Sequence, residues 1–132
     1  MVRSLIVYAA TARGDAALRE AVRAGGRLTV VALAPVEPSD RRCCDTRSTY
    51  WNGVQRELAA SELARARLVV EGADDVSLEV LAFDVPRPVE TILRRAAAVG
   101  AERIVLADPR MSGLGRRAVR RLRQRTAVPV TG

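Results

Sequence analysis

The chain has 132 residues, 48% of them hydrophobic, and its formal net charge of +7 comes from 22 arginines without any lysine. That length suits one domain, residues 1–132, with its own apolar core, and the lack of any histidine removes the commonest general base and metal ligand, which argues against hydrolytic and metal-dependent enzymes. No segment approaches the ~20 apolar residues of a membrane span, and the first residues lack the longer apolar region of a secretory signal, so a cytoplasmic protein without a membrane partner is predicted.

The beginning of the chain predicts a strand, a helix and a second strand. Residues 4–10 contain three consecutive large apolar side chains, as in a strand buried on both faces of a parallel sheet. Asp15 is the predicted N-cap of a short helix that ends at Ala24. Residues 28–34 form the second strand, and Pro35 is expected to stop it.

The middle of the chain predicts a long loop, the longest helix and a third strand. Residues 36–50 are polar and charged, and a loop of that length in a compact domain is typically functional or disordered. Trp51 or Asn52 is expected to open a helix that runs to about Val70, and residues 76–83 form the third strand. The predicted buried stripe of the helix consists of Val54, Leu58, Leu63, Ala66 and Val70.

The last third shows the most regular alternation of elements. A helical pattern covers residues 88–99 and ends at Gly100, which suits the left-handed conformation at a helix C-terminus. An apolar run of about four residues begins at Ile104, too short for a helix and right for a buried strand. A loop with two glycines at residues 111–115 then leads into another helical pattern and a closing strand at residues 127–130.

This order of elements predicts a three-layer, doubly wound α/β sandwich built on five parallel strands. In such sheets a ligand binds at the carboxyl ends of the strands, where a loop enters a helix. Any small-molecule site should therefore include the loop at residues 107–116. Asp84 and Asp108 also follow strands at that edge, where each could bind a ribose or a cation and is equally well placed to start a turn.

Positive charge is concentrated at the end of the chain. Residues 1–100 hold 14 arginines against 13 acidic residues, whereas residues 101–132 hold eight against two. The last helix, which runs to about Thr126, combines a narrow apolar face with six arginines: Arg116, Arg117, Arg120, Arg121, Arg123 and Arg125. Such a basic stripe can bind nucleic-acid phosphates. The chain has only one Trp, two Tyr and one Phe for stacking, so a solvated helix face is favoured and a nucleic-acid partner is not expected.

The adjacent pair Cys43-Cys44 allows two interpretations. Adjacent cysteines form only a strained disulfide ring, and neither a Cys-x-x-Cys spacing nor a histidine supports a metal site. Arg41 and Arg42 would lower the pKa of a neighbouring thiol, which allows a reactive cysteine. Two ordinary reduced thiols in a loop are favoured.

Aromatic residues and the usual catalytic residue types give little further indication of function. Tyr50 and Trp51 are expected to pack on the sheet or cover an apolar edge, with stacking on an adenine as the alternative. No Ser-His-Asp triad, metal cluster or carboxylate pair can be assembled from the sequence. We therefore predict that the protein acts by binding and is not an enzyme, with weak ATP hydrolysis left open.

Three segments carry a resemblance to a known family. They are PVETIL at residues 88–93, VGAERIVL at residues 99–106 and the terminal pair Pro129-Val130. The first two resemble the helix and fourth strand of the universal stress protein family, and the pair resembles the family's closing strand. The resemblance follows the order of elements over the whole chain. It implies a five-stranded parallel sheet of order 3-2-1-4-5, of the Rossmann-like type that binds adenine nucleotides.

The resemblance also shows where this chain departs from the family's nucleotide motif. Many members bind ATP through G-x-x-G after the fourth strand, a spacer, and then Gly followed by Ser or Thr, because glycines let backbone N–H groups approach the phosphates. Here Ala107 and Arg110 stand at the first two glycine positions, and the spacer is several residues shorter. Gly115 matches the later glycine and Arg116 replaces the hydroxyl residue. Thr11 stands near the place of an aspartate that contacts the ribose.

The resemblance therefore implies a stress-response regulatory domain with a degenerate site for ATP or AMP, bound weakly, or for a small anion. The candidate residues of that site are Thr11, Leu33, Ala107, Asp108, Ser112, Gly113, Gly115 and Arg116. Family members commonly dimerise through the last strand, so a homodimer is a further expectation. The alternatives are a nucleotide-independent protein-interaction domain and a nucleic-acid-associated regulator using the arginine helix. An adenine-nucleotide-handling enzyme is less favoured, because the sequence has neither a pyrophosphate loop nor a P-loop lysine.

Overall fold

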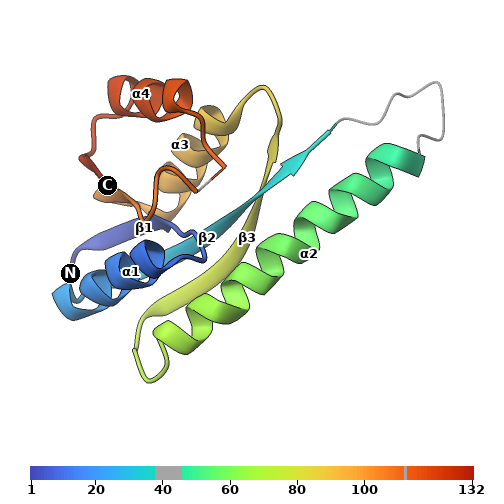
Figure 1. Cartoon of the computed structure of the whole chain (residues 1–132). Helices are drawn as coiled ribbons and strands as arrows, with labels where there is room; N and C mark the ends of the chain where they lie inside the picture. Colours follow the sequence, from blue (N-terminus) through green and yellow to red (C-terminus); the bar gives the residue numbers. More distant parts are fainter. Residues whose placement is uncertain (38–45, 112) are drawn as a thin grey trace.

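A computed structural model describes residues 1–37, 46–111 and 113–132 of the chain. In chain order its elements are β1 (Arg3–Val7), α1 (Ala12–Ala24), β2 (Arg27–Val36), α2 (Thr46–Val69), β3 (Val76–Asp84), α3 (Pro88–Val99), β4 (Arg103–Leu106), α4 (Arg116–Arg125) and β5 (Val130–Thr131). Helices and strands alternate throughout (Figure 1). None of the helices in these ranges combines the length and apolar character that a membrane span requires.

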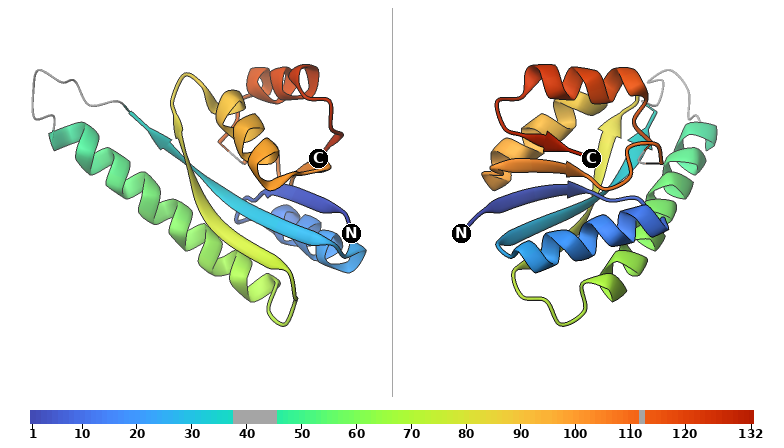
Figure 2. Two further views of the ribbon diagram at one scale, coloured as in Figure 1. Left: turned by 180° about the vertical axis from the view of Figure 1, so that it is seen from behind. Right: turned by 60° about the vertical axis from the view of Figure 1, so that its left-hand side comes forward.

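The strands form one parallel sheet in the order β3-β2-β1-β4-β5. Helices α1 and α2 cover one face of this sheet, and α3 and α4 cover the other (Figures 1 and 2). The three-layer, doubly wound architecture and the strand order predicted from the sequence are both confirmed. Gly100 ends α3 in the left-handed conformation, with φ 66° and ψ 37°, also as predicted.

Each face of the sheet has its own apolar core, because successive side chains of a strand point to opposite faces. The core on the α3–α4 side includes Leu5, Val7, Val31, Ile92, Ile104, Leu106 and Leu122. The core on the α1–α2 side includes Ile6, Tyr8, Leu18, Leu28, Val30 and Ala66. The unbroken apolar run of β1 is thereby buried on both faces, which is the pattern expected of a central parallel strand.

Pro35 does not stop the second strand. It lies inside β2, in register with Phe83 of β3. The carbonyls of Val31 and Val36 accept hydrogen bonds from Tyr8 on the β1 side and from Val85 on the β3 side, respectively. Alternation along the strand therefore turns Pro35 toward the β1 side, where β1 has already ended at Val7. Since no strand in the described part of the chain pairs with β2 on that side at Pro35, the missing N–H of proline costs no ladder bond.

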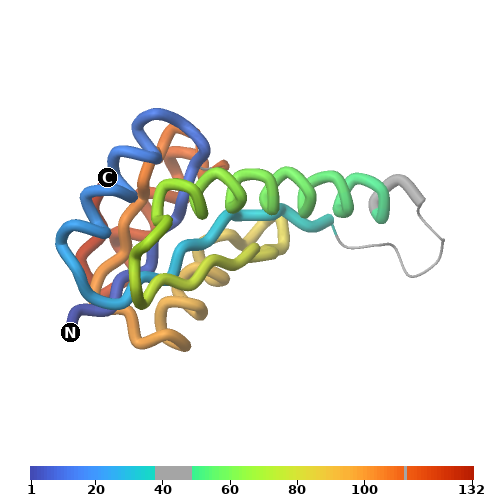
Figure 3. The backbone as a smooth tube through the Cα atoms, turned by 90° about the horizontal axis from the view of Figure 1, so that it is seen from below, coloured from blue at the N-terminus to red at the C-terminus, as the bar shows by residue number. Residues whose placement is uncertain are grey.

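The longest helix begins earlier than the sequence indicated. It starts at Thr46, several residues before Trp51, so part of the predicted loop is helical. The predicted buried stripe is also wrong at Leu58, which is 53% exposed, while its neighbour Ala59 is 1% exposed. Alanine at that position lets α2 lie close to the long β2–β3 pair, and all three project beyond the rest of the molecule (Figure 3).

Two further details of the middle segment differ from expectation. Tyr50 does not pack on the sheet but is 76% exposed, whereas Trp51 is half-buried. Cys43 and Cys44 lie outside the described residues, so their interpretation stays a prediction.

The first and last strands are shorter than predicted: β1 ends at Val7, and β5 covers Val130–Thr131.

A matched pair of glycine substitutions tests how closely α1 approaches the end of β1. A Cβ added to Gly14 would lie 1.8 Å from the carbonyl oxygen of Ala9, whereas one added to Gly53, inside α2, would meet no atom within 4 Å. Gly14→Ala should therefore lower the free energy of unfolding by about 3 kcal/mol. Gly53→Ala should raise it by about 0.5–1 kcal/mol, because alanine favours the helix. Urea unfolding followed by circular dichroism measures both, and similar effects of the two substitutions would contradict this close approach.

Candidate ligand site at the carboxyl edge of the sheet

The topological switch point of the sheet, where the direction in which successive strands are added reverses, lies between β1 and β4. These strands are neighbours, yet β1 leads into α1 on one face and β4 leads into α4 on the other (Figure 2). In open α/β sheets ligands bind at this kind of switch point, outside the carboxyl ends of the strands. The candidate site is therefore bounded by residues 8–15, after β1, and residues 107–116, after β4.

Thr11 connects the two strand exits. Its side-chain oxygen accepts the backbone N–H of Gly14 at 3.0 Å, which makes Thr11 the N-cap of α1. The same hydroxyl donates to Oδ2 of Asp108 at 2.8 Å. A hydroxyl can do both, because it carries one donor hydrogen and two lone pairs. Asp108 is only 5% exposed, and the hydrogen bond from Thr11 holds its carboxylate next to the segment that follows β1.

Asp15 was the predicted N-cap, and this prediction is wrong. Asp15 lies in the first turn of α1, is 8% exposed, and turns back toward the end of β1. Tyr8 donates its hydroxyl to Oδ1 of Asp15 at 2.5 Å, and Arg65 of α2 donates to Oδ2 from Nε and Nη2 at 3.0 and 2.7 Å. Nη1 of Arg65 also donates to the carbonyl of Ala10 at 3.1 Å. The Asp15 carboxylate therefore joins Tyr8 and Arg65 and does not cap α1.

The protonation states of this network fit its hydrogen bonds. Burial raises the pKa of the Tyr8 hydroxyl, and the carboxylate of Asp15 acts in the same direction. Burial by itself would raise the pKa of Asp15, but the hydrogen bonds from Arg65 and Tyr8 and the charge of Arg65 outweigh it and hold that pKa below its usual range. At neutral pH Tyr8 is therefore a donor and Asp15 an ionised acceptor. The network fixes the path of the chain from β1 into α1.

Two of the predicted site residues lie in the apolar core. Ala107 is 7% exposed and packs on the α1–α2 side, while its N–H donates to the carbonyl of Val7 at 3.0 Å. Leu33 is partly buried and packs against the core on the α3–α4 side. Both lie along the carboxyl-terminal half of the sheet, and their assignment to a ligand stays a prediction.

The start of α4 has neither a side-chain cap nor an acidic residue. Gly115 is its N-cap and supplies no side-chain acceptor, and the first turn contains Arg116 and Arg117 but no acidic residue. The first backbone N–H groups of a helix have no partner within the helix, and they attract negative charge. Gly113 precedes them with φ 81°, in the left-handed region that glycine favours. Ser112 lies outside the described residues.

A hollow of about 810 Å³ opens between the loop after β4 and the outer face of α4. Its described lining contains four arginines and no acidic residue, together with the apolar side chains of Leu114 and Val119. The arginines are Arg110, Arg116, Arg120 and Arg123. The loop predicted from the sequence thus borders a cationic hollow next to an uncapped helix start. Asp108 is not part of this lining.

The apolar face of α4 packs as predicted, with Leu122 fully buried and Ala118 and Val119 against the core. Part of its arginine stripe is engaged within the molecule. Arg125 forms an ion pair with Glu90 of α3 at 2.6 Å, and Arg123 donates to the carbonyl of Gly132 at 2.7 Å. These contacts bind arginines of the last turns of α4 to the rest of the protein, whereas Arg116 and Arg117 of its first turn are exposed.

Solved structures match this fold over nearly the whole chain, whereas no protein-family model and no curated protein sequence matches it. A universal stress protein family member from Burkholderia pseudomallei aligns with a TM-score of 0.71 and 19% identity, covering 97% of this chain and 92% of the other. UspA from Lactobacillus plantarum aligns with a TM-score of 0.70 and 16% identity, covering 97% and 94%. The chain has the universal stress protein fold. A third member, from Archaeoglobus fulgidus in complex with dAMP, aligns with a TM-score of 0.55 and 21% identity, covering 99% and 95%.

The universal stress protein resemblance seen in the sequence is thus confirmed at the level of the fold. The structure brings Thr11 and Asp108 into contact and places Gly113, Gly115 and Arg116 at the start of α4. In the described ranges no group of three or more His, Cys, Asp or Glu side chains could hold a metal ion.

Sequence reasoning missed the contacts of Tyr8, Asp15 and Arg65. The one available signal was an acidic residue three positions before the buried Leu18, on the inner side of a helix. A charge at such a position requires a buried partner. Nothing in the sequence, however, identified Arg65 as that partner.

The double role of the Thr11 hydroxyl can be tested by paired substitutions. Thr11→Val keeps the shape but removes the cap and the bond to Asp108, so the free energy of unfolding should fall by about 2 kcal/mol. Thr11→Ser keeps the hydroxyl and should change it by no more than about 0.5 kcal/mol. Thermal or urea unfolding measures the difference. An equal loss in both variants would show that the methyl group, and not the hydroxyl, matters here.

The low pKa of Asp15 predicts a pH dependence with a definite sign. Because the pKa is lower in the folded than in the unfolded chain, the stabilisation is complete above the unfolded value of about 3.9 and is lost as the pH falls through the folded value. Asp15→Asn should therefore lower the free energy of unfolding by about 2 kcal/mol at pH 7. The gap between wild type and variant should narrow below about pH 4. Glu20→Gln, an exposed change in the same helix, is the control, and a gap that stays constant from pH 7 to pH 3 would refute the assignment.

Proposed function

We propose that this chain is a universal stress protein–like regulatory domain that acts by binding a small phosphate-bearing ligand, of the adenine nucleotide class (ATP or AMP), at the carboxyl edge of its sheet. One observation carries the proposal: the uncapped start of α4 opens beside a hollow lined by four arginines and no acidic residue, next to the switch point of the sheet. The dAMP complex of the Archaeoglobus fulgidus protein, which shares this fold, supports an adenine nucleotide as the ligand.

The phosphate end of the ligand supplies most of the binding in this proposal. Backbone N–H groups at the start of α4 meet the phosphates, and Arg110 and Arg116 add charge from two sides of the loop. Leu114 and Val119 provide apolar surface in the same hollow. The hollow therefore combines apolar surface with convergent charged groups, which suits a small anionic molecule.

The switch point itself weakens the binding of the rest of the nucleotide. Thr11, which stands where the family's nucleotide-binding members would contact the ribose, is already bonded to Asp108. A ribose hydroxyl would have to compete with that bond. The carboxylate of Asp108 also repels phosphates that approach the crevice between β1 and β4. The ligand is therefore bound weakly and from the α4 side.

Catalysis is not part of the proposal. The chain contains no histidine, and Asp108, the buried carboxylate nearest the loop, is held by Thr11 and not directed at the hollow. Pairing of β5 with a second copy of the chain stays a prediction, as do the protein partners. In the described residues β5 lies at the outer edge of the sheet, where such pairing would occur.

An isosteric pair at Gly115 separates binding from folding. Gly115 has φ −70° and ψ 164°, and a Cβ there would meet no atom within 4 Å, so both Asp and Asn fit and can cap α4. Both variants should be at least as stable as the wild type. Gly115→Asp places a negative charge at the start of the helix and should weaken ATP and AMP binding at least tenfold relative to Gly115→Asn. Isothermal titration calorimetry, preceded by analysis of the nucleotides that copurify, makes the comparison.

Each result of that comparison decides the proposal. Binding by the wild type and by Gly115→Asn, with loss in Gly115→Asp, supports a nucleotide site at the start of α4. Equal binding by both variants would move the ligand away from this helix. The absence of copurified nucleotide and of heat at millimolar ATP would instead indicate a nucleotide-independent interaction domain.

A further inference from the structure

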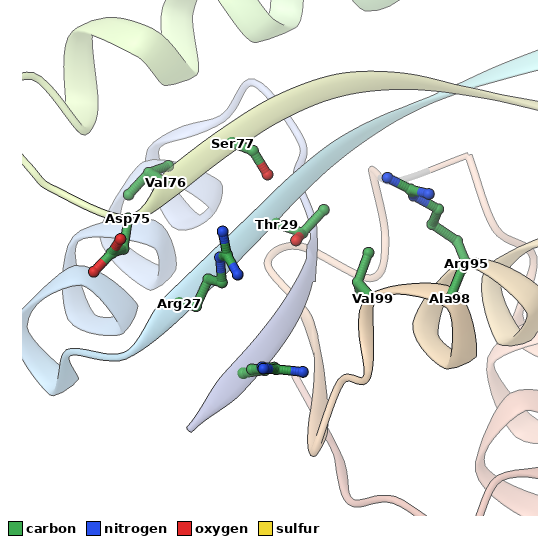
Figure 4. A pocket seen from close by; sticks show the side chains of 9 residues that line it. Arg27, Thr29, Asp75, Val76, Ser77, Arg95, Ala98 and Val99 are labelled. Atoms are coloured by element: carbon green, nitrogen blue, oxygen red, sulfur yellow. The ribbon is translucent and has the colours of Figure 1, made fainter. Parts of the chain in front are cut away.

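A second hollow lies at the opposite, amino-terminal edge of the sheet, on the face that α3 covers (Figure 4). Its volume is about 460 Å³, and it lies between the beginnings of β1, β2 and β3 and the second half of α3. Thr29 and Ser77 form its floor as register partners on β2 and β3, and their short side chains leave the space open. Figure 4 shows Thr29 and Ser77 side by side on the strands, between Arg27 and Arg95.

Two arginines lie next to each other at this edge without a counter-ion. Arg3 and Arg27 are register partners on β1 and β2, and like charges on neighbouring strands repel each other. In the described part of the chain neither guanidinium has an ion-pair or hydrogen-bond partner. The side chain of Arg3 is directed at the end of α3, since its Nη1 lies 3.0 Å from the position of a Cβ on Gly100.

The other charged groups of the lining do not neutralise this pair. Arg95 of α3 is bound to Glu79 of β3 by two hydrogen bonds, one of 2.8 Å from Nη2 to Oε2, so its charge is already balanced. Asp75 is the one acidic residue of the described lining, and no ion pair joins it to Arg27. Arg3 and Arg27 are both exposed, and Glu102, whose Oε1 accepts the backbone N–H of Arg3 at 3.4 Å, lies outside the lining. Within the described lining, two unpaired guanidinium groups against one carboxylate leave an excess of positive charge.

A hydroxyl without a partner in the described protein also faces the hollow. Thr29 is 7% exposed, yet within the described residues its hydroxyl makes no hydrogen bond. The described residues contain no fully enclosed side-chain N or O atom without a partner, so this hydroxyl opens onto the hollow that Thr29 lines.

We propose that this amino-edge hollow binds a small phosphorylated metabolite, with its phosphate group held by Arg3 and Arg27 and by the hydroxyl of Thr29. Guanidinium groups bind phosphate oxygens in pairs and match their geometry. A phosphate monoester carries close to two negative charges at neutral pH, which suits two adjacent arginines better than a single carboxylate does. The volume of the hollow lies within the range of small-molecule sites. This site is separate from the one at the start of α4 and does not depend on it.

The test is a titration of the ¹⁵N-labelled protein with inorganic pyrophosphate, followed through backbone amide shifts. Saturable shifts at Thr29, Ser77 and Val99 are expected, and shifts at Gly113 and Gly115 report the other edge separately. Arg27→Gln should weaken binding at the amino edge at least tenfold. Arg23→Gln, which removes an exposed arginine from the last turn of α1, is the control of equal charge and should leave it within about twofold.

Two further variants keep the test independent of folding. Thr29→Val preserves the shape and removes only the hydroxyl, so it should weaken binding about fivefold without loss of stability. Asp75→Asn should strengthen binding about threefold, because it removes the competing carboxylate, and Asn tolerates the left-handed φ of 57° at that position. Damage to the fold cannot produce tighter binding.

Several results would overturn the proposal. Pyrophosphate shifts confined to the start of α4, or equal weakening by Arg27→Gln and Arg23→Gln, would show that the hollow is not a phosphate site. Unchanged binding by both Thr29→Val and Asp75→Asn would do the same. If Gly115→Asp abolished binding at Thr29 and Ser77, the two sites would not be separate.

Discussion

The close contact between the first turn of α1 and the end of β1 determines the geometry of the whole carboxyl edge. Because Gly14 has no side chain, the helix can lie directly against the carbonyl of Ala9. That approach brings the Thr11 hydroxyl within reach of both the helix N–H groups and Asp108 across the sheet. It also turns Asp15 back toward Tyr8. A larger residue at position 14 would separate these groups, and the two strand exits would lose their connection.

The fold could be predicted from local patterns because each element carries its own signal. Buried parallel strands show unbroken apolar runs, and α1 and α3 each end at a glycine. The errors occurred where the deciding partner is distant in the sequence. Asp15 is a good N-cap by local rules, and only Arg65, 50 residues later, makes it the centre of a buried network. Proline usually ends a strand. Pro35 costs β2 no ladder hydrogen bond only because β1 ends before it.

The same distinction applies to the candidate site. Gly113, Gly115 and Arg116 were placed correctly at the start of a helix, because glycine loops and helix starts are local features. The bond between Thr11 and Asp108 spans 97 residues and depends on β1 and β4 being neighbours. The family resemblance implied that neighbourhood, but no local pattern indicated the bond itself. Sequence patterns therefore located the glycine loop and the start of α4, whereas the sheet topology decided which polar groups at the edge are already engaged.

Helix ends give the two edges of the sheet opposite electrostatic character. At the carboxyl edge α4 presents backbone N–H groups, which attract an anion even without charged side chains. At the amino edge α3 presents carbonyl groups, so an anion there depends entirely on cationic side chains. Arg3 lies against Gly100 and offsets the end of α3, which has no basic residue in its own last turn. Arg27 comes from β2 and has no such role. The positive charge at the amino edge thus exceeds what the helix end requires. This excess faces the same hollow as the hydroxyl of Thr29, so simple compensation of a helix dipole does not account for it.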